Sequence, residues 1–133
     1  MYQKVMIIGN VGKEPELRYT PGGTAVASFS VGVNKSRKKE DGSWDSQTAW
    51  FKVTCWGKLA ENIDKYIQKG NRVFIEGELV FDPQTGSPKT YAMNYGRVGA
   101  SFEINAGVIR NLTPKPVNAG GNPSTEYDDA IPF

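Results

Sequence analysis

Residues 50–81 read WFKVTCWGKLAENIDKYIQKGNRVFIEGELVF, two strand-like runs on either side of a helix-like run. In the first run every second side chain is apolar, which is the spacing of one buried strand face. The apolar positions of the middle run fall at helical spacing: Leu59, Ile63, Tyr66 and Ile67. Gly70 stands where a left-handed cap at a helix C-terminus is expected. The stretch therefore predicts a strand, a helix that plugs the end of a barrel, and a second strand.

Further β-branched and aromatic runs lie outward from this stretch, separated by Gly, Pro and Asp clusters typical of a small antiparallel barrel. We expect strands over residues 4–13, 25–34, 47–56, 71–81 and 101–110. A helix between the third and fourth strands is the order of an OB fold. The predicted fold class is therefore all-β with one helix, a five-stranded OB-fold barrel in residues 1–112.

Residues 113–133 differ in character, because they read TPKPVNAGGNPSTEYDDAIPF and hold almost no large apolar side chain before the end. Such a segment cannot bury enough surface to offset its ordering entropy, so we expect a disordered tail. Residues 1–112 hold fifteen Lys and Arg against eleven Asp and Glu, a net charge of +4, whereas residues 113–133 carry −2. This asymmetry predicts a polyanionic ligand for the body and a separate function for the acidic tail.

The composition argues against several function classes. The chain has no histidine, which removes the commonest general base near neutral pH and the commonest metal ligand. Cys55 is the only cysteine, so an internal disulfide and a cysteine-rich zinc site are excluded, and we expect a buried thiol. We expect no enzyme activity, no cofactor and no metal. Neither a membrane-length apolar run nor a secretory leader is present, so we expect a cytoplasmic protein.

The third predicted strand carries the first candidate site. One of its faces is wholly apolar and suited to a core: Phe51, Val53 and Cys55. The other face presents Trp50, Lys52, Thr54 and Trp56. Exposed indoles that flank a lysine suit unpaired bases and phosphates, although tryptophans are also common at subunit contacts and barrel rims.

Two connections add further candidates. Between the second and third strands a cationic run precedes an Asp41-Gly42 turn signal and Trp44, which predicts a protruding hairpin that is either a solvated loop or a backbone clamp. The cations of this run are Lys35, Arg37, Lys38 and Lys39. Residues 82–100 form a long loop or hairpin of the kind that frames the ligand groove of OB folds. Its candidates, which could equally serve local packing, are Lys89, Tyr91, Tyr95 and Arg97.

Four stretches together resemble the bacterial single-stranded DNA-binding protein family. They are GNVGKEPELRYTPGG (9–23), TAWFKVTCWGKLAE (48–61), KGNRVFIEGEL (69–79) and DDAIPF (128–133). The resemblance implies a homotetramer of OB folds that coats unpaired DNA without sequence preference in replication, recombination and repair, close to the nucleoid. By motif, Trp50, Lys52 and Trp56 match DNA-facing positions on the third strand, and Lys4 matches a basic position on the first strand.

Three positions depart from the pattern that the resemblance implies. Ser36 stands where many relatives carry a tryptophan on the near arm of the basic hairpin, whereas here Trp44 lies on the far arm. Many relatives also carry a tryptophan just after the fourth strand, where this chain has Phe81 and then Gln84, and we expect Phe81 to be the substitute. Phe51 follows the third-strand tryptophan, where a histidine at a subunit contact is frequent, so assembly would use an apolar contact.

The acidic-aromatic tip is expected to dock in replication and repair proteins: Asp128, Asp129, Ala130, Ile131, Pro132 and Phe133. Pro132 restricts the backbone before an aromatic anchor, and the acidic pair would steer the tip to a basic surface. A role in solubility alone is the alternative for an acidic tail. Two other functions remain open for the body, a nuclease and an OB module for structured RNA or replication restart. The predicted face lacks a metal-site cluster, and the tip argues against the RNA module.

Overall fold

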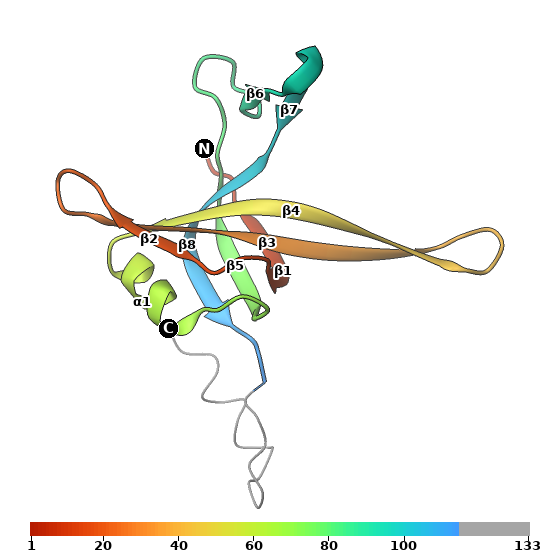
Figure 1. Cartoon of the computed structure of the whole chain (residues 1–133), viewed down its shortest axis with the longest axis horizontal. Helices are drawn as coiled ribbons and strands as arrows, with labels where there is room; N and C mark the ends of the chain where they lie inside the picture. Colours follow the sequence, from red (N-terminus) through yellow and green to blue (C-terminus); the bar gives the residue numbers. More distant parts are fainter. Residues whose placement is uncertain (115–133) are drawn as a thin grey trace, which may run out of the picture.

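Five strands close into a barrel in the computed structural model, which describes residues 1–114 (Figure 1). In chain order the elements are β1 (Val5–Val11), β2 (Glu16–Tyr19), β3 (Ala25–Lys38), β4 (Trp44–Trp56), α1 (Lys58–Tyr66), β5 (Arg72–Leu79), β6 (Thr90–Ala92), the 3-10 turn η1 (Asn94–Gly96), β7 (Val98–Ala100) and β8 (Phe102–Asn111). The sheet runs β1-β5-β8-β4-β3, and β3 pairs back to β1 to close it. The β4–β8 pairing is parallel and the others are antiparallel. The predicted five-stranded OB-fold barrel with one helix is confirmed.

The barrel sheet extends beyond the predicted strands in two places. The ladder between β3 and β4 continues out to the pair Lys38 and Trp44, so the two strands form a long ribbon that projects from the barrel (Figure 1). β2 adds a short edge strand along β3, with which it is joined by a turn at Gly23, whose φ is +87°. Residues 82–100, expected as a loop or hairpin, hold the small β6–β7 hairpin on a second projection.

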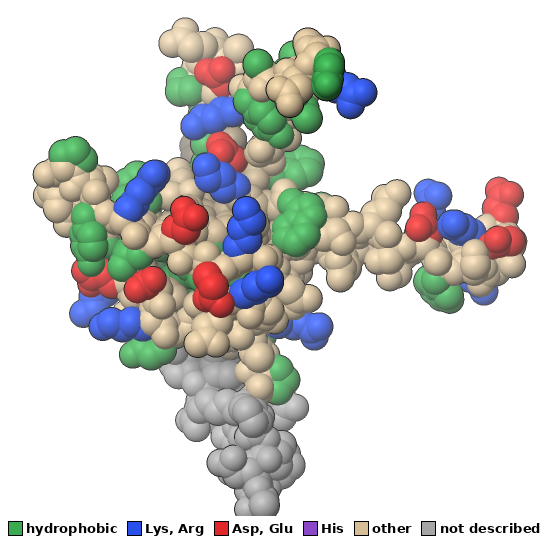
Figure 2. Space-filling view, viewed as in Figure 1, with side chains coloured by type: hydrophobic (Ala, Val, Ile, Leu, Met, Phe, Trp, Pro, Cys, Tyr) green, Lys and Arg blue, Asp and Glu red, His purple; other side chains and the backbone are tan. Residues whose placement is uncertain are grey.

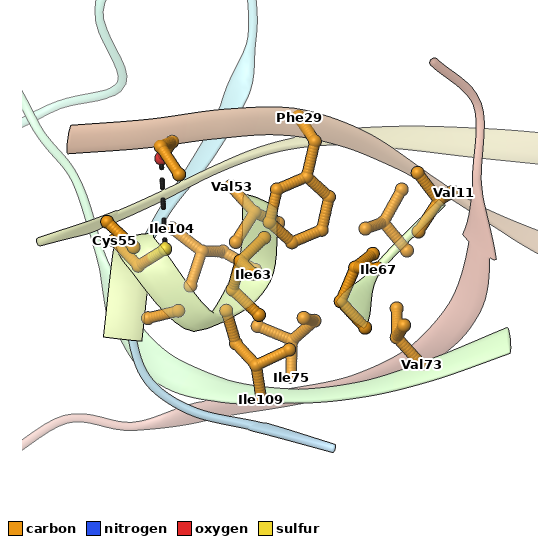
Figure 3. Close-up of a cluster of buried hydrophobic side chains, with 14 of the residues drawn as sticks. Val11, Phe29, Val53, Cys55, Ile63, Ile67, Val73, Ile75, Ile104 and Ile109 are labelled. Atoms are coloured by element: carbon orange, nitrogen blue, oxygen red, sulfur yellow. Dashed lines mark hydrogen bonds between the residues drawn. The ribbon is translucent and has the colours of Figure 1, made fainter. Parts of the chain in front are cut away.

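The barrel interior is filled mainly by aliphatic side chains from every wall, together with Phe29 and Cys55 (Figure 3). Val53 of β4, Ile75 of β5 and Ile104 of β8 are fully buried. α1 adds Ile63, also fully buried, because the helix packs mainly on β3 and covers one end of the barrel. The hydrophobic effect on these side chains therefore holds the walls and the helix together.

Two details of the predicted helix are wrong. α1 ends at Tyr66, because the chain becomes extended at Ile67. Of these two residues, Ile67 is buried in the core, whereas Tyr66 is 61% exposed. Gly70 is not the helix cap. It has a φ of +89° in the turn before β5, where its N–H donates to the carbonyl of Val11 at 2.8 Å. Within residues 1–114, no helix has the length and apolar character needed to cross a membrane.

A bulge in the ladder between β5 and β8 depends on one glycine. The register shifts between Glu76 and Gly77, where Gly107 of β8 is the extra residue between two paired neighbours. A Cβ at Gly77 would overlap the backbone oxygen of Asn105, whereas a Cβ at Gly107 would meet nothing within 4 Å. The two glycines therefore form a matched pair for testing this packing.

We predict that Gly77→Ala lowers the free energy of unfolding by about 1–3 kcal/mol, because the added methyl forces two paired strands apart. Gly107→Ala should stay within about 1 kcal/mol of the wild type, since the methyl points into open space. Urea unfolding of the two variants side by side measures the difference. Equal stabilities would contradict this description of the bulge.

Candidate nucleic-acid interface

β4 carries the candidate interface on its outward side. Val53 and Cys55 are fully buried, whereas Trp50 is 56% and Trp56 is 52% exposed, so the predicted alternation of this strand is confirmed. Phe51, expected in the core, is only half-buried: it packs against the core from one side, lines an open hollow, and stacks on the ring of Phe102 with centroids 5.2 Å apart. The outer side of β4 therefore presents two large aromatic surfaces to solvent.

Trp50 lies on a floor that only glycine provides. Gly32 of β3 is its partner across the ladder, and a Cβ there would lie 3.0 Å from Cζ3 of the indole. A Cβ at Gly12, just after β1, would lie 2.6 Å from the same atom. The indole therefore packs directly on two stretches of backbone, which fixes its orientation before any ligand arrives. The sequence reasoning missed both glycines, although a glycine inside the VGV run of β3 is itself a signal of close approach.

An open hollow of about 350 Å³ adjoins this indole. Its polar lining comes mainly from β2, from β3, from β4 and from the segment between β1 and β2, and includes Lys13, Glu14, Glu16, Ser28, Ser30 and Lys52. Lysines and hydroxyls are common contacts for phosphate, so the hollow offers a path for a charged backbone beside the aromatic surface. Lys13 and the two serines were not predicted, because serines at alternate positions of a strand are ordinary outward residues.

Cations and carboxylates are interspersed over the barrel surface (Figure 2). The Lys52 ammonium lies 3.9 Å from one oxygen of Glu103, and the Lys89 ammonium lies 3.9 Å from the other oxygen. The structure therefore brings two of the predicted lysines together around one carboxylate, next to the tryptophan side of β4.

The basic hairpin divides its predicted residues between two faces. Pairing places Lys38 opposite Trp44 on one face, and Lys35 and Arg37 opposite Gln47 and Asp45 on the other. The second face encloses a small hollow of about 180 Å³ lined by these four side chains. Trp44 is 70% exposed and lies on the same side of β4 as Trp50 by strand alternation.

A short turn closes this hairpin at residues 39–43. The Lys39 N–H donates to the Ser43 carbonyl at 2.7 Å, and Gly42 has a φ of +87°. Asp41 accepts hydrogen bonds from the hydroxyl and the N–H of Ser43, at 2.6 and 2.9 Å, and these bonds hold the pKa of its carboxyl below the ordinary value. Asp41 is thus a turn residue, as the Asp41-Gly42 signal indicated.

Lys4 lies on another part of the barrel. Its ammonium is 3.8 Å from Glu76 of β5 and 5.7 Å from the centroid of the Tyr2 ring. A hydrogen bond with Tyr2 and the charge of Glu76 raise the pKa of Lys4. β1 and β5 are separated from β4 by β3 on one side and β8 on the other, so the structure does not bring Lys4 into the tryptophan cluster.

The remaining predicted aromatics lie at or beyond the end of β5. Phe81 is 53% exposed just after that strand. Tyr91 of β6 is half-exposed and its ring packs over Gly99 of β7, whereas Tyr95 is fully exposed at the tip of the hairpin, next to Arg97, with a φ of +65°. These side chains form a separate arm that extends the surface beyond β4. The tip at residues 128–133 lies outside the described residues.

In residues 1–114 the side chains that could ligate a metal ion are the carboxylates and the thiol of Cys55. Among residues 1–114, no group of three or more His, Cys, Asp or Glu side chains is arranged to hold a metal ion. Cys55 is buried, and its burial raises the pKa of the thiol to about 11, which keeps it protonated near neutral pH.

Comparison with known proteins identifies the family. Residues 2–105 match the profile of the Single-strand binding protein family, and this match runs from before β1 into β8 and includes both projections. The chain belongs to this family. The family resemblance of the sequence motifs is thereby confirmed.

Individual relatives agree with this assignment. A single-stranded DNA-binding protein of Wolinella succinogenes is 32% identical over 127 residues, which are 96% of this chain and 74% of the relative. One from Xanthomonas axonopodis pv. citri is 40% identical over 83 residues, which are 62% of this chain and 46% of the relative. The chain thus matches about half of the length of several relatives.

Two solved structures are similar in fold. The Plasmodium falciparum SSB in complex with ssDNA superposes with a TM-score of 0.67 at 27% identity, covering 84% of this chain and 96% of that one. A small single-stranded DNA-binding protein from Streptomyces coelicolor gives a TM-score of 0.66 at 23% identity, covering 82% of this chain and 93% of that one. The second likeness supports the fold alone.

We predict that Gly12→Ala displaces the Trp50 indole further into solvent, because the new methyl would occupy the space in which the indole ring now packs. In a background with Trp44→Phe and Trp56→Phe, Trp50 is the only indole, so its emission should shift to longer wavelength and become easier to quench with acrylamide. Gly22→Ala is the control, since a Cβ there meets only the Thr20 hydroxyl at 4.0 Å. Identical spectra for the two glycine variants would contradict the packing of the Trp50 indole on the backbone of Gly12.

Proposed function

We propose that the chain binds single-stranded DNA without sequence preference through the outward side of β4. The observation that carries this proposal is a strand on which Trp50 and Trp56 are both more than half exposed, with Lys52 between them. Exposed indoles in such number are unfavourable in water unless a ligand or a partner covers them. Unpaired bases suit them because every base has a flat face, and phosphates suit the intervening cation.

The spacing of the aromatic residues supports an extended ligand. Trp44, Trp50 and Trp56 recur every six residues on one side of β4, and strand geometry puts about 20 Å between neighbours. The ribbon of β3 and β4 therefore offers stacking surfaces along about 40 Å of a single strand of nucleic acid. Duplex DNA keeps its bases stacked on one another, so it cannot use these surfaces.

The relatives support the same ligand. The Plasmodium falciparum protein of similar fold is in complex with ssDNA, and the relatives in Wolinella and Xanthomonas are named for single-stranded DNA binding. Binding alone accounts for the polar residues of the face, and we propose no catalytic role and no cofactor. Replication, recombination and repair in the cytoplasm, close to the nucleoid, are the processes in which such binding would act.

We also propose a homotetramer, supported by an apolar patch away from β4. Met6 and Ile8 on the outer side of β1 are 63% and 54% exposed, and Phe74 of β5, half-buried, lies opposite Ile8. Closed symmetric assembly is the usual outcome for identical subunits, and this patch is the surface that we propose for one of the contacts. Sedimentation velocity at micromolar concentration should give a tetramer, and a monomer would contradict the proposal.

Trp50→Ala and Trp56→Ala should each weaken binding to unpaired DNA by about 1–3 kcal/mol, equally for all base compositions, because stacking is lost. Trp44→Ala should cost less, because this indole lies out on the hairpin. Tyr66→Ala, which removes an exposed aromatic from α1, is the control and should leave affinity unchanged. Unchanged affinity in both β4 variants would place the groove elsewhere, and loss of oligomerisation instead would favour a subunit contact.

The tip at residues 128–133 is proposed to recruit replication and repair proteins, on the strength of its sequence. Deleting Phe133 should abolish capture of such partners and leave DNA affinity nearly unchanged, because the acidic residues of the tail stay in place. Removal of the whole tail should leave DNA affinity equal or slightly higher, because the negative tail competes with DNA for the basic body. Pull-down and DNA titration on the same preparation measure both activities. Unchanged partner capture, or a large loss of DNA affinity, would refute this assignment.

A further inference from the structure

Glu103, near the start of β8, stands between two elements of the proposed interface. Its register partner is Lys52 of β4, whose ammonium lies 3.9 Å from Oε1, and the ammonium of Lys89 lies 3.9 Å from Oε2. The glutamate side chain is only 20% exposed, whereas the lysine side chains are 58% and 52% exposed. One sheltered carboxylate thus faces two accessible cations beside the tryptophans.

We propose that the Glu103 carboxylate competes with DNA phosphates for these two lysines, so that a phosphate must displace the carboxylate in order to bind. This competition limits the affinity of the interface and keeps DNA readily released. This inference rests on the proposed function. A phosphate that reaches Lys52 takes the place of the carboxylate as counter-charge, and Glu103 is then left facing that phosphate. Each binding event therefore exchanges one anion for another and adds a like-charge repulsion.

The lengths of the two contacts indicate whether Glu103 competes with phosphate for the lysines or positions the lysines for it. A charge-assisted hydrogen bond to a carboxylate has a length of about 2.7–2.9 Å, so both contacts at 3.9 Å are loose ion pairs. Loose pairs with exposed lysines do little to order the side chains. The main effect of Glu103 on a ligand is then to cancel one of two positive charges. Removing its charge should strengthen binding, whereas a positioning residue would weaken it when changed.

The test is Glu103→Gln in the full chain, which keeps the size of the side chain and removes its charge. Titration with unpaired DNA of mixed sequence should show roughly three-fold tighter binding at low salt, the size of one screened repulsion at about 7 Å. The decline of affinity with salt should be steeper, because a net positive charge has been added and more counterions are released. The gain should therefore disappear at high salt, and dissociation should be slower at low salt.

Two controls separate the local charge from other effects. Glu61→Gln, at an exposed position of α1, makes the same change in net charge and should give a smaller gain. Glu103→Asp keeps the charge on a shorter side chain and should bind like the wild type. Thermal unfolding of all three variants verifies that each is folded at the temperature of the titration.

The outcomes distinguish failure of the competitor role of Glu103 from failure of the proposed single-stranded DNA binding. Failure of the wild-type chain to bind unpaired DNA would remove the proposed function itself. If the wild type binds and Glu103→Gln binds more weakly, or no better than Glu61→Gln, the competitor role is overturned. If Glu103→Asp gains affinity as Glu103→Gln does, the effect comes from shape and the competitor role is again overturned.

Discussion

The two-residue period of β4 is the constraint on which the rest of the molecule depends. Because Val53 and Cys55 must face the barrel interior, Trp50, Lys52 and Trp56 must face outward. A shift of one residue in the pairing of β3 with β4 would bury two indoles and a lysine and expose the core. The stability of the fold and the exposure of the aromatic side chains therefore depend on the same strand register.

The glycines make this register compatible with a fixed aromatic surface. Gly32 and Gly12 leave room for the Trp50 indole to lie on the backbone, so the ring is oriented by the fold itself. An oriented ring loses less conformational entropy when a base stacks on it than a free ring would. The cations beside it are less ordered, since Lys52 and Lys89 share Glu103 through long contacts. The interface thus combines rigid stacking surfaces with adjustable charges.

Much of this could be predicted from the sequence, and the reasons for the misses are physical. Alternation in residues 50–56 predicted the two faces of β4, and the helix between two strands predicted the barrel order. Tyr66 and Gly70 were misplaced because tertiary packing ends α1 early, to bring Ile67 into the core. The packing of the Trp50 indole on Gly12 and Gly32 and the contacts of Glu103 with two lysines join residues distant in the sequence. The glycine inside β3 signals a close approach, but no local pattern identifies its partner. Lys4 was predicted by motif as a basic position of the first strand, and its side chain contacts Tyr2 and Glu76 of β5.

The most direct test of the central claim compares three ligands at one salt concentration. The full chain is titrated with an unpaired DNA strand of mixed sequence, with the duplex form of that sequence, and with a structured RNA of the same length. If β4 presents stacking surfaces that only unpaired bases can use, the unpaired DNA binds most tightly and base composition matters little. Duplex DNA or structured RNA bound as tightly as the unpaired strand would contradict the account.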